Sequence, residues 1–219
     1  GEYNYKELYY AEVAARTDAS SRFGKDHRWG MFWSLGFMWN IKNEAFLKEI
    51  EWLTNAQIKL STGTSGNSEI PYYDHLALVA GDANYNDEAG IYPKQSGNEE
   101  LSWEQTWANN IGLTLGFFNR VNLNVDFYHK KTTNMLMLVP QSYAITGVGN
   151  RWDNIGAMMN RGVEIAMDGD VIRTKYFTWN LSANVSYNKN KLLELYNGVE
   201  EYVNSTTGLK YVVGHPVHE

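Results

Sequence analysis

The stretch from Arg28 to Ile41 constrains the fold of this chain more than any other segment. Every second residue in it is large and apolar, and the residues between them are mostly small or polar. Successive side chains of a β-strand point to opposite faces, so this period of two indicates a strand with one apolar face. The apolar row consists of Trp29, Met31, Trp33, Leu35, Phe37, Trp39 and Ile41. A row of this length suits a wall between lipid and water better than it suits a soluble sandwich.

The same alternation recurs along the chain. From Phe177 to Tyr187, aromatic and aliphatic residues alternate with Thr, Asn and Ser throughout. The complete pattern predicts about seven strands, near residues 7–18, 28–41, 56–64, 102–118, 121–138, 161–172 and 177–189. A soluble antiparallel sheet with one face in water produces the same alternation, so the pattern alone leaves both architectures open.

The composition of the chain excludes several classes of protein. The absence of cysteine excludes a disulfide framework and a thiolate metal site. The net charge of −6 provides no electrostatic basis for binding nucleic acid. No apolar run approaches the roughly 18 residues that a membrane-spanning helix needs. Aromatic residues make up 14% of the chain, which fits the aromatic girdles of membrane β-barrels.

The predicted connections between strands alternate between short and long. Asn119 and Arg120 form a very short turn between two strong strands, and another short turn contains Thr174 and Lys175. Long polar connections lie elsewhere, at residues 19–27, 65–101 and 139–158 and from Leu193 onward, and a shorter connection lies at residues 42–54. Outer-membrane barrels have this asymmetry, with short periplasmic turns and long external loops. An odd number of strands does not close such a barrel, so we expect an all-β, antiparallel up-and-down transmembrane segment of a larger barrel.

Several motifs of the chain are similar to those of one family of outer-membrane proteins. Residues 16–24 (RTDASSRFG), followed by Arg28-Trp29-Gly30, resemble the R-x-D-x-S-S-x-F-G…R-W-G segment of the SusC/RagA-type TonB-linked proteins. Further matching segments follow in the family's order, at residues 63–67, 103–104, 110–112, 126–128, 130–132, 154–156, 160–164, 177–179 and 186–191. The chain departs from the family pattern at Thr17 and Ala19.

This resemblance implies a fold, a location and a set of partners. Members of the family resemble 22-stranded barrels with an N-terminal plug, and they lie in the outer membrane of Gram-negative cells. They import oligosaccharides, less often peptides, using energy from the TonB complex and a SusD-type surface lipoprotein as a lid. Residues 1–219 are then expected to be a partial, C-terminal segment of the barrel surrounded by outer-membrane lipid, with the plug and the remaining strands absent.

Four polar residues are candidates for a substrate path through the barrel. Asp126, Glu164, Asn180 and Asn184 all fall on the polar rows of their strands. A charge that faces lipid is expensive at mid-depth, so the two carboxylates are expected to face the lumen. The alternative is that these groups do no more than hydrate a wall that faces water or pair with the plug.

Four tyrosines are candidates for contacts outside the membrane. Tyr72, Tyr73, Tyr85 and Tyr92 lie in the long connection at residues 65–101. Loops of this length are often functional, and the family resemblance implies that external loops touch the substrate or the lid. The same tyrosines could instead pack the loop on itself.

The sequence contains no set of residues typical of an enzyme. His215 and His218 lack the further ligands that a zinc site needs, and residues 82–88 lack the glycine and the final acid of a calcium loop. We therefore predict no catalytic residue, no metal site and no cofactor. Two functions remain, namely a segment of a TonB-dependent transporter for oligosaccharides and a soluble all-β carbohydrate-binding or adhesion module. A requirement for detergent would distinguish the first from the second.

Overall fold

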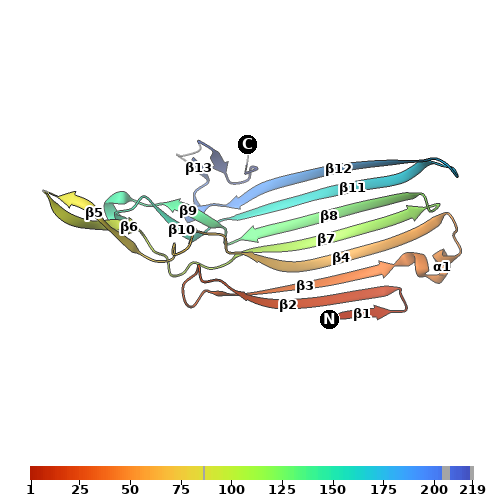
Figure 1. Cartoon of the computed structure of the whole chain (residues 1–219), viewed down its shortest axis with the longest axis horizontal. Helices are drawn as coiled ribbons and strands as arrows, with labels where there is room; N and C mark the ends of the chain where they lie inside the picture. Colours follow the sequence, from red (N-terminus) through yellow and green to blue (C-terminus); the bar gives the residue numbers. More distant parts are fainter. Residues whose placement is uncertain (86, 204–207, 218–219) are drawn as a thin grey trace.

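The main part of the molecule is an eight-stranded antiparallel sheet of order β1-β2-β3-β4-β7-β8-β11-β12. The computed structural model describes residues 1–85, 87–203 and 208–217. Its sheet strands are β1 (Glu2–Tyr5), β2 (Tyr9–Ala19), β3 (Trp29–Asn40), β4 (Leu53–Asn67), β7 (Glu104–Phe117), β8 (Val121–Thr133), β11 (Ala157–Arg173) and β12 (Thr178–Glu194). Apart from β1 they are 11 to 17 residues long and run side by side in a curved wall (Figure 1). The predicted all-β, up-and-down architecture is confirmed.

Smaller elements lie at the ends of this sheet. Three two-stranded hairpins are made by β5 (Leu78–Tyr85) with β6 (Glu88–Gln95), β9 (Leu136–Pro140) with β10 (Asn150–Asn154), and β13 (Glu201–Val203) with β14 (Lys210–Val212). The short helices are η1 (Ile41–Asn43), α1 (Ala45–Lys48), α2 (Tyr143–Thr146) and η2 (Tyr196–Gly198). None of the helices in the described residues has the length and apolar character required to cross a membrane.

The short strand β1 was not predicted, and one predicted strand differs in extent from the observed one. The pattern extends a single strand over residues 121–138, whereas β8 ends at Thr133 and the chain then enters β9. Asn134 has a φ of 53°, a left-handed conformation that breaks an extended strand. The apolar residues after it pair with β10 instead of continuing in the sheet. Alternation within a segment does not reveal this change of partner.

The connections at the two ends of the sheet differ in character: the right end of Figure 1 has tight turns and the η1–α1 segment at residues 41–52, and the left end has the two longest connections. At the right end of Figure 1, β7 and β8 are joined through Phe118 and Asn119, whose φ values of 54° and 52° suit a tight type I′ hairpin. The Arg120 N–H donates to the Phe117 carbonyl at 2.9 Å and closes this turn. At the left end lie residues 20–28, 68–103 and 134–156, including the projecting β5–β6 hairpin (Figure 1).

The pairing register joins the apolar rows of neighbouring strands into bands that cross the sheet. One row of directly opposed residues runs through Ala11, Phe37, Leu60, Ile111, Phe127, Val163 and Tyr187. These side chains are largely uncovered, and Phe37, Ile111 and Phe127 are 40%, 55% and 51% exposed. Trp29 at the start of β3 is 73% exposed. We call this side of the sheet the apolar face.

The buried core lies beneath the long connections rather than behind the sheet. Phe23, Ile70 and Leu101 form it, and Trp103, Leu136 and Trp152 pack around them. A soluble sheet would bury its apolar face against such a core, so this arrangement disfavours a soluble module. Phe32, an exception on the polar row of β3, is 2% exposed and makes an edge-to-face contact with Trp103.

Candidate functional site

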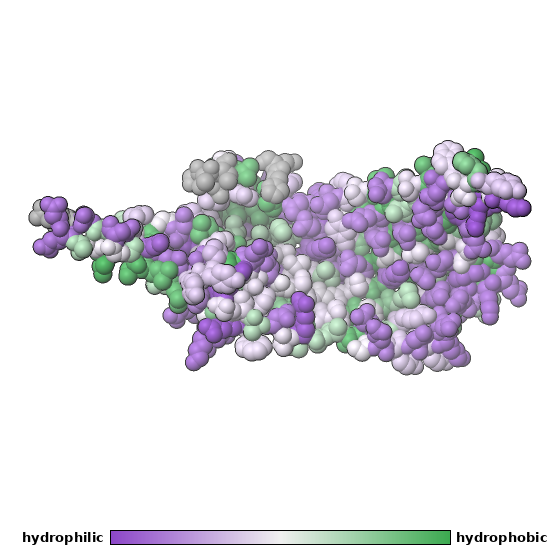
Figure 2. All heavy atoms as spheres, viewed as in Figure 1, coloured by the Kyte–Doolittle hydropathy of each residue, from purple (hydrophilic) through white to green (hydrophobic). Residues whose placement is uncertain are grey.

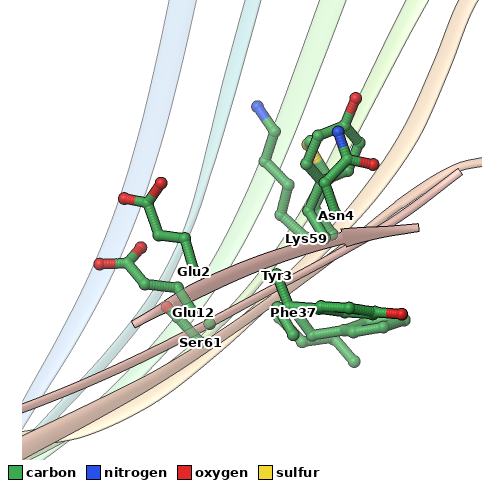
Figure 3. Close-up of a pocket in the computed structure, with 12 residues that line it drawn as sticks. Glu2, Tyr3, Asn4, Glu12, Phe37, Lys59 and Ser61 are labelled. Atoms are coloured by element: carbon green, nitrogen blue, oxygen red, sulfur yellow. The ribbon is translucent and has the colours of Figure 1, made fainter. Parts of the chain in front are cut away.

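The side of the sheet opposite the apolar face carries polar side chains and holds the candidate site. We call it the polar face. Figure 3 shows the division between the faces at β1–β4, with Glu2, Glu12 and Ser61 on one side of the strands and Tyr3 and Phe37 on the other. Figure 2 shows hydrophilic residues spread over the long strands on the side turned to the viewer. The groove drawn in Figure 3 has a volume of about 670 Å³ and takes lining residues from both faces, so we assign no site to it.

The structure brings the two predicted carboxylates of the polar face together. Asp126 of β8 and Glu164 of β11 are directly opposed across neighbouring strands. They line a hollow of about 450 Å³ together with Asn110, Tyr128, Lys130, Asn160 and Asn188. Gly112 lies opposite Asp126 on the other neighbouring strand, and its missing side chain leaves room for the Asp126 carboxylate. These groups can donate hydrogen bonds to a hydrated ligand and accept them from it.

The two predicted asparagines lie in different positions relative to this hollow. Asn184 lines an adjoining hollow of about 380 Å³ with Asp126 and Glu164. The Asn180 side-chain amide instead donates to a carboxylate oxygen of Asp170 at 3.3 Å, near the short-turn end of the sheet. Three of the four predicted residues therefore belong to one cluster, and Asn180 does not.

Tyr128 shapes the same hollow, and its role was missed in the sequence. Its hydroxyl donates to the Asn188 side-chain carbonyl at 3.1 Å, and the Lys130 ammonium lies 5.4 Å from its ring centroid. The ring lies over Gly162, which faces both Tyr128 and Asn188 in the register. A large ring above a strand glycine is a known device for stabilising sheets. A sequence signal was present, because Gly162 stands between larger residues at positions 158–161 and 163–165.

Replacing Gly162 by alanine should destabilise the sheet by about 1–3 kcal/mol because the added methyl group overpacks the site. A Cβ at this position would lie 2.5 Å from the Tyr128 hydroxyl oxygen and would also meet the Tyr187 carbonyl. Gly36→Ala is the matched control, since its Cβ would first meet Glu12 at 3.6 Å. Chemical unfolding of the refolded full-length protein measures both changes. An equal effect of the two variants would contradict the placement of the Tyr128 ring.

Other polar groups of this face bond across strands. Asn110 donates to Ser61 at 3.1 Å, and the Thr114 hydroxyl donates to Asn124 at 2.9 Å. The Asn122 amide donates to Asp168 at 2.9 Å. Such cross-strand pairs stabilise a sheet while leaving free lone pairs and N–H groups for water. The polar face is therefore both rigid and able to stay hydrated.

The long connections are tied together at their bases. The Trp103 indole N–H donates to the Arg28 carbonyl at 2.9 Å, and the Asn98 amide donates to the Trp152 carbonyl at 3.1 Å. Asn154 donates to the Ser102 carbonyl at 2.8 Å and accepts from the Ser102 N–H at 2.7 Å. Several residues that carry the family resemblance, such as Phe23, Trp103 and Asn154, thus hold the long connections together through packing and hydrogen bonds.

The predicted loop tyrosines occupy two separate parts of the connection at residues 68–103. Tyr72 and Tyr73 lie in the turn before β5 and are each 65% exposed. Tyr92 lies in β6, where its hydrogen bond to the Asp82 carboxylate, together with the charge of that group, raises the pKa of Tyr92 above its ordinary value. Tyr85 ends β5, but its side chain lies outside the described part of the structure.

Tyr72 also borders a hollow between two long connections. This hollow of about 530 Å³ is lined by Ser20, Arg22, Asn67, Glu69 and Tyr72, among others. The Arg22 guanidinium lies 4.7 Å from the Tyr72 ring centroid and donates to the Ser68 carbonyl at 3.2 Å. Within residues 1–85, 87–203 and 208–217, no three acidic or His side chains are grouped to hold a metal ion, and His218 lies outside these ranges.

Comparison with known proteins identifies the family. The model of the family described as "TonB dependent receptor-like, beta-barrel" matches residues 2–217. The chain is 38% identical over 194 residues to TonB-dependent receptor P39 of Formosa agariphila, covering 88% of this chain and 19% of the relative. It is 36% identical over 212 residues to TonB-dependent receptor SusC of Bacteroides thetaiotaomicron, covering 90% of this chain and 21% of the relative.

Solved structures agree with this relationship. The structure described as the RagAB peptide transporter superposes with a TM-score of 0.91 at 38% identity, covering 98% of this chain and 24% of that one. The chain thus spans about a fifth of the length of the curated relatives it matches. The family consists of outer-membrane receptors and not of enzymes, which agrees with the resemblance stated from the motifs. The chain belongs to the TonB-dependent receptor family and forms part of its β-barrel.

Proposed function

We propose that this chain is part of the wall of a TonB-dependent transporter that imports oligosaccharides, with the polar face lining the lumen. The observation that carries the proposal is the division of the sheet into an uncovered apolar face and a hydrated polar face. Lipid lowers the cost of exposing the first, and water or a hydrated substrate accommodates the second. The cluster around Asp126 and Glu164 then lies on the substrate path.

The chemistry of the polar face supports a polyhydroxylated substrate. The side-chain amides of Asn110, Asn160 and Asn188 line the hollow around Asp126 and Glu164. They can both donate hydrogen bonds to sugar hydroxyls and accept them. A peptide is the second candidate, because the RagAB relative is described as a peptide transporter. The opposed carboxylates Asp126 and Glu164 favour positively charged groups of such a peptide.

The partners follow from the same proposal. The TonB complex supplies the energy, and a SusD-type surface lipoprotein closes over the long connections from outside. The exposed rings of Tyr72, Tyr73 and Tyr92 are then available to the lid or to the substrate. Aromatic rings combine an apolar body with a polar tip, which makes them effective at such interfaces.

Deletion of the full-length receptor should abolish growth on one class of oligosaccharide while growth on its monosaccharide continues. Growth is measured on a panel of oligosaccharides and on a pool of peptides as alternative nutrients. Loss of growth on peptides with all oligosaccharides still used would assign peptide import instead. Unchanged growth on every nutrient of both kinds would contradict a role in import.

The same strain tests the candidate lumen cluster. Complementation with a receptor carrying Asp126→Asn and Glu164→Gln should lower the uptake rate severalfold, because two charges of the path are removed. Asp170→Asn is the control, since Asp170 lies on the same face but bonds to Asn180 outside the hollow. Equal uptake by the double variant and the wild-type receptor would contradict a role of these carboxylates in transport. They would then serve only to hydrate the wall.

A further inference from the structure

A group of basic side chains lies on the apolar face, directly beyond the end of the apolar band. His129, Arg161 and Lys189 are opposed to one another across β8, β11 and β12. In the next row of the same face, Lys131 and Lys191 flank Met159. All five side chains project from the same side as Phe127, Val163 and Tyr187, the last apolar row below them. We call the group the outer basic patch, made of His129, Lys131, Arg161, Lys189 and Lys191.

The two rows of the patch contain no compensating negative charge, and Glu194, at the end of β12, pairs with Ala157 in the row beyond the patch. The outward side chains from Val121 to Lys131, from Met159 to Gly169 and from Trp179 to Lys191 include neither Asp nor Glu. Among the described residues, no ion pair joins a member of the patch to an acid. His129, Lys131, Arg161 and Lys189 are exposed, and Lys191 is partly exposed. This concentration is unexpected in a chain whose net charge is −6.

The arrangement is costly without an outside partner. Like charges that face each other directly across neighbouring strands destabilise a sheet. Arg161 directly faces the Lys189 ammonium on β12, and the imidazole of His129 faces it on β8. The acids of β8 and β11, such as Asp126 and Glu164, lie on the opposite face of the sheet and do not offset this charge locally. An anion held between the basic groups removes the repulsion.

The patch lies at the level of lipid headgroups. Below it, the outward apolar residues of β12 run from Trp179 to Tyr187, close to the roughly 9–11 residues with which a tilted strand crosses a bilayer. Tyr187, which is 65% exposed, ends this band, and Trp107, which is 51% exposed, is opposed to Lys131 beside the patch. Exposed aromatic rings of this kind form the girdles of outer-membrane barrels. The patch is at the end that bears the long connections, which in outer-membrane barrels is the extracellular end.

We propose that the outer basic patch binds the phosphate groups of a lipid in the outer leaflet of the outer membrane. Phosphate is the fitting anion, because a guanidinium pairs with its oxygens in a bidentate manner and lysine ammonium groups add point charges. The acyl chains of the same lipid then lie along the apolar band below. The site is distinct from the polar face and does not depend on the transported substrate.

Lipid binding by the full-length receptor in detergent micelles tests this site. The probe is diphosphoryl lipid A, and the readout is the dissociation constant from native mass spectrometry. The double variant Arg161→Gln and Lys189→Gln should bind at least about tenfold more weakly, since hydrogen bonds to charged groups are strong. The charge-preserving double variant Arg161→Lys and Lys189→Arg should retain most of the affinity, which separates loss of charge from a fault in folding.

Lys130→Gln provides the matched control. Lys130 is adjacent in sequence to His129 and Lys131 but points to the polar face, where it contacts Tyr128. Its removal should leave lipid binding unchanged. Equal affinity of the wild-type protein and the neutral double variant would overturn the proposal. So would equal binding of a dephosphorylated lipid A, or displacement of diphosphoryl lipid A by an equal concentration of inorganic phosphate.

Discussion

Replacing Leu181 by arginine should destabilise the full-length barrel by up to about 2–4 kcal/mol, the cost of an arginine on the lipid face near the midplane. Leu181 lies among the outward residues of β12 and is 51% exposed on the apolar face. In a membrane this exposed surface contacts acyl chains, which cannot hydrate a guanidinium. The free energy of unfolding is measured by guanidinium titration of receptor refolded into lipid vesicles.

Asn180→Arg is the control for this prediction. Asn180 is the preceding residue and faces the other way, where its amide bonds to the Asp170 carboxylate. An arginine there keeps water and a negative partner, so the expected change is within about 0.5 kcal/mol. If the two variants lost the same stability, the assignment of one face to lipid and the other to water would fail.

Replacing Leu101 by alanine should cost about 2–5 kcal/mol of local stability in the long connections. Leu101 is 0% exposed and packs with Phe23 and Ile70 in the core beneath these connections. The resulting cavity loosens segments that this core holds together. Hydrogen exchange in the full-length receptor should accelerate at residues 20–28, 68–103 and 134–156, while exchange in the long sheet strands β7, β8, β11 and β12 stays slow.

Ile145→Ala is the matched control for the loop core. Ile145 is also an aliphatic residue of a long connection, but it is 85% exposed in α2. Its truncation should change the free energy of unfolding by no more than about 0.5 kcal/mol. Faster exchange in the long strands of the Leu101 variant, matching that in the connections, would show that the core supports the sheet and not the connections alone.

Features that arise within a single strand or turn were predictable from the sequence. The alternation from Arg28 to Ile41 predicted β3 and its apolar face, since side-chain direction in a strand depends on position alone. The short connection at Asn119 predicted the tight hairpin between β7 and β8, because Asn tolerates a positive φ. The family resemblance came from motifs that the structure places partly in the connections and partly within the long strands.

Contacts between strands were not predictable in the same way. Asp126 and Glu164 were each placed on a polar row, but their direct opposition depends on the register of β8 with β11. The outer basic patch was missed for the same reason, since His129, Arg161 and Lys189 are far apart in sequence. The sequence did not explain why Phe32 stands on a polar row. The structure does, because Phe32 packs edge-to-face against Trp103.

The sequence by itself determined that this chain forms strands with one apolar and one polar face, and which family it resembles. The tertiary structure decided which residues of different strands meet, where the chain leaves the sheet at Asn134, and where the buried core lies. The physical reason is that alternation is a local property of an extended backbone, whereas register depends on hydrogen bonds and packing between distant segments. The substrate-path cluster and the outer basic patch both depend on register.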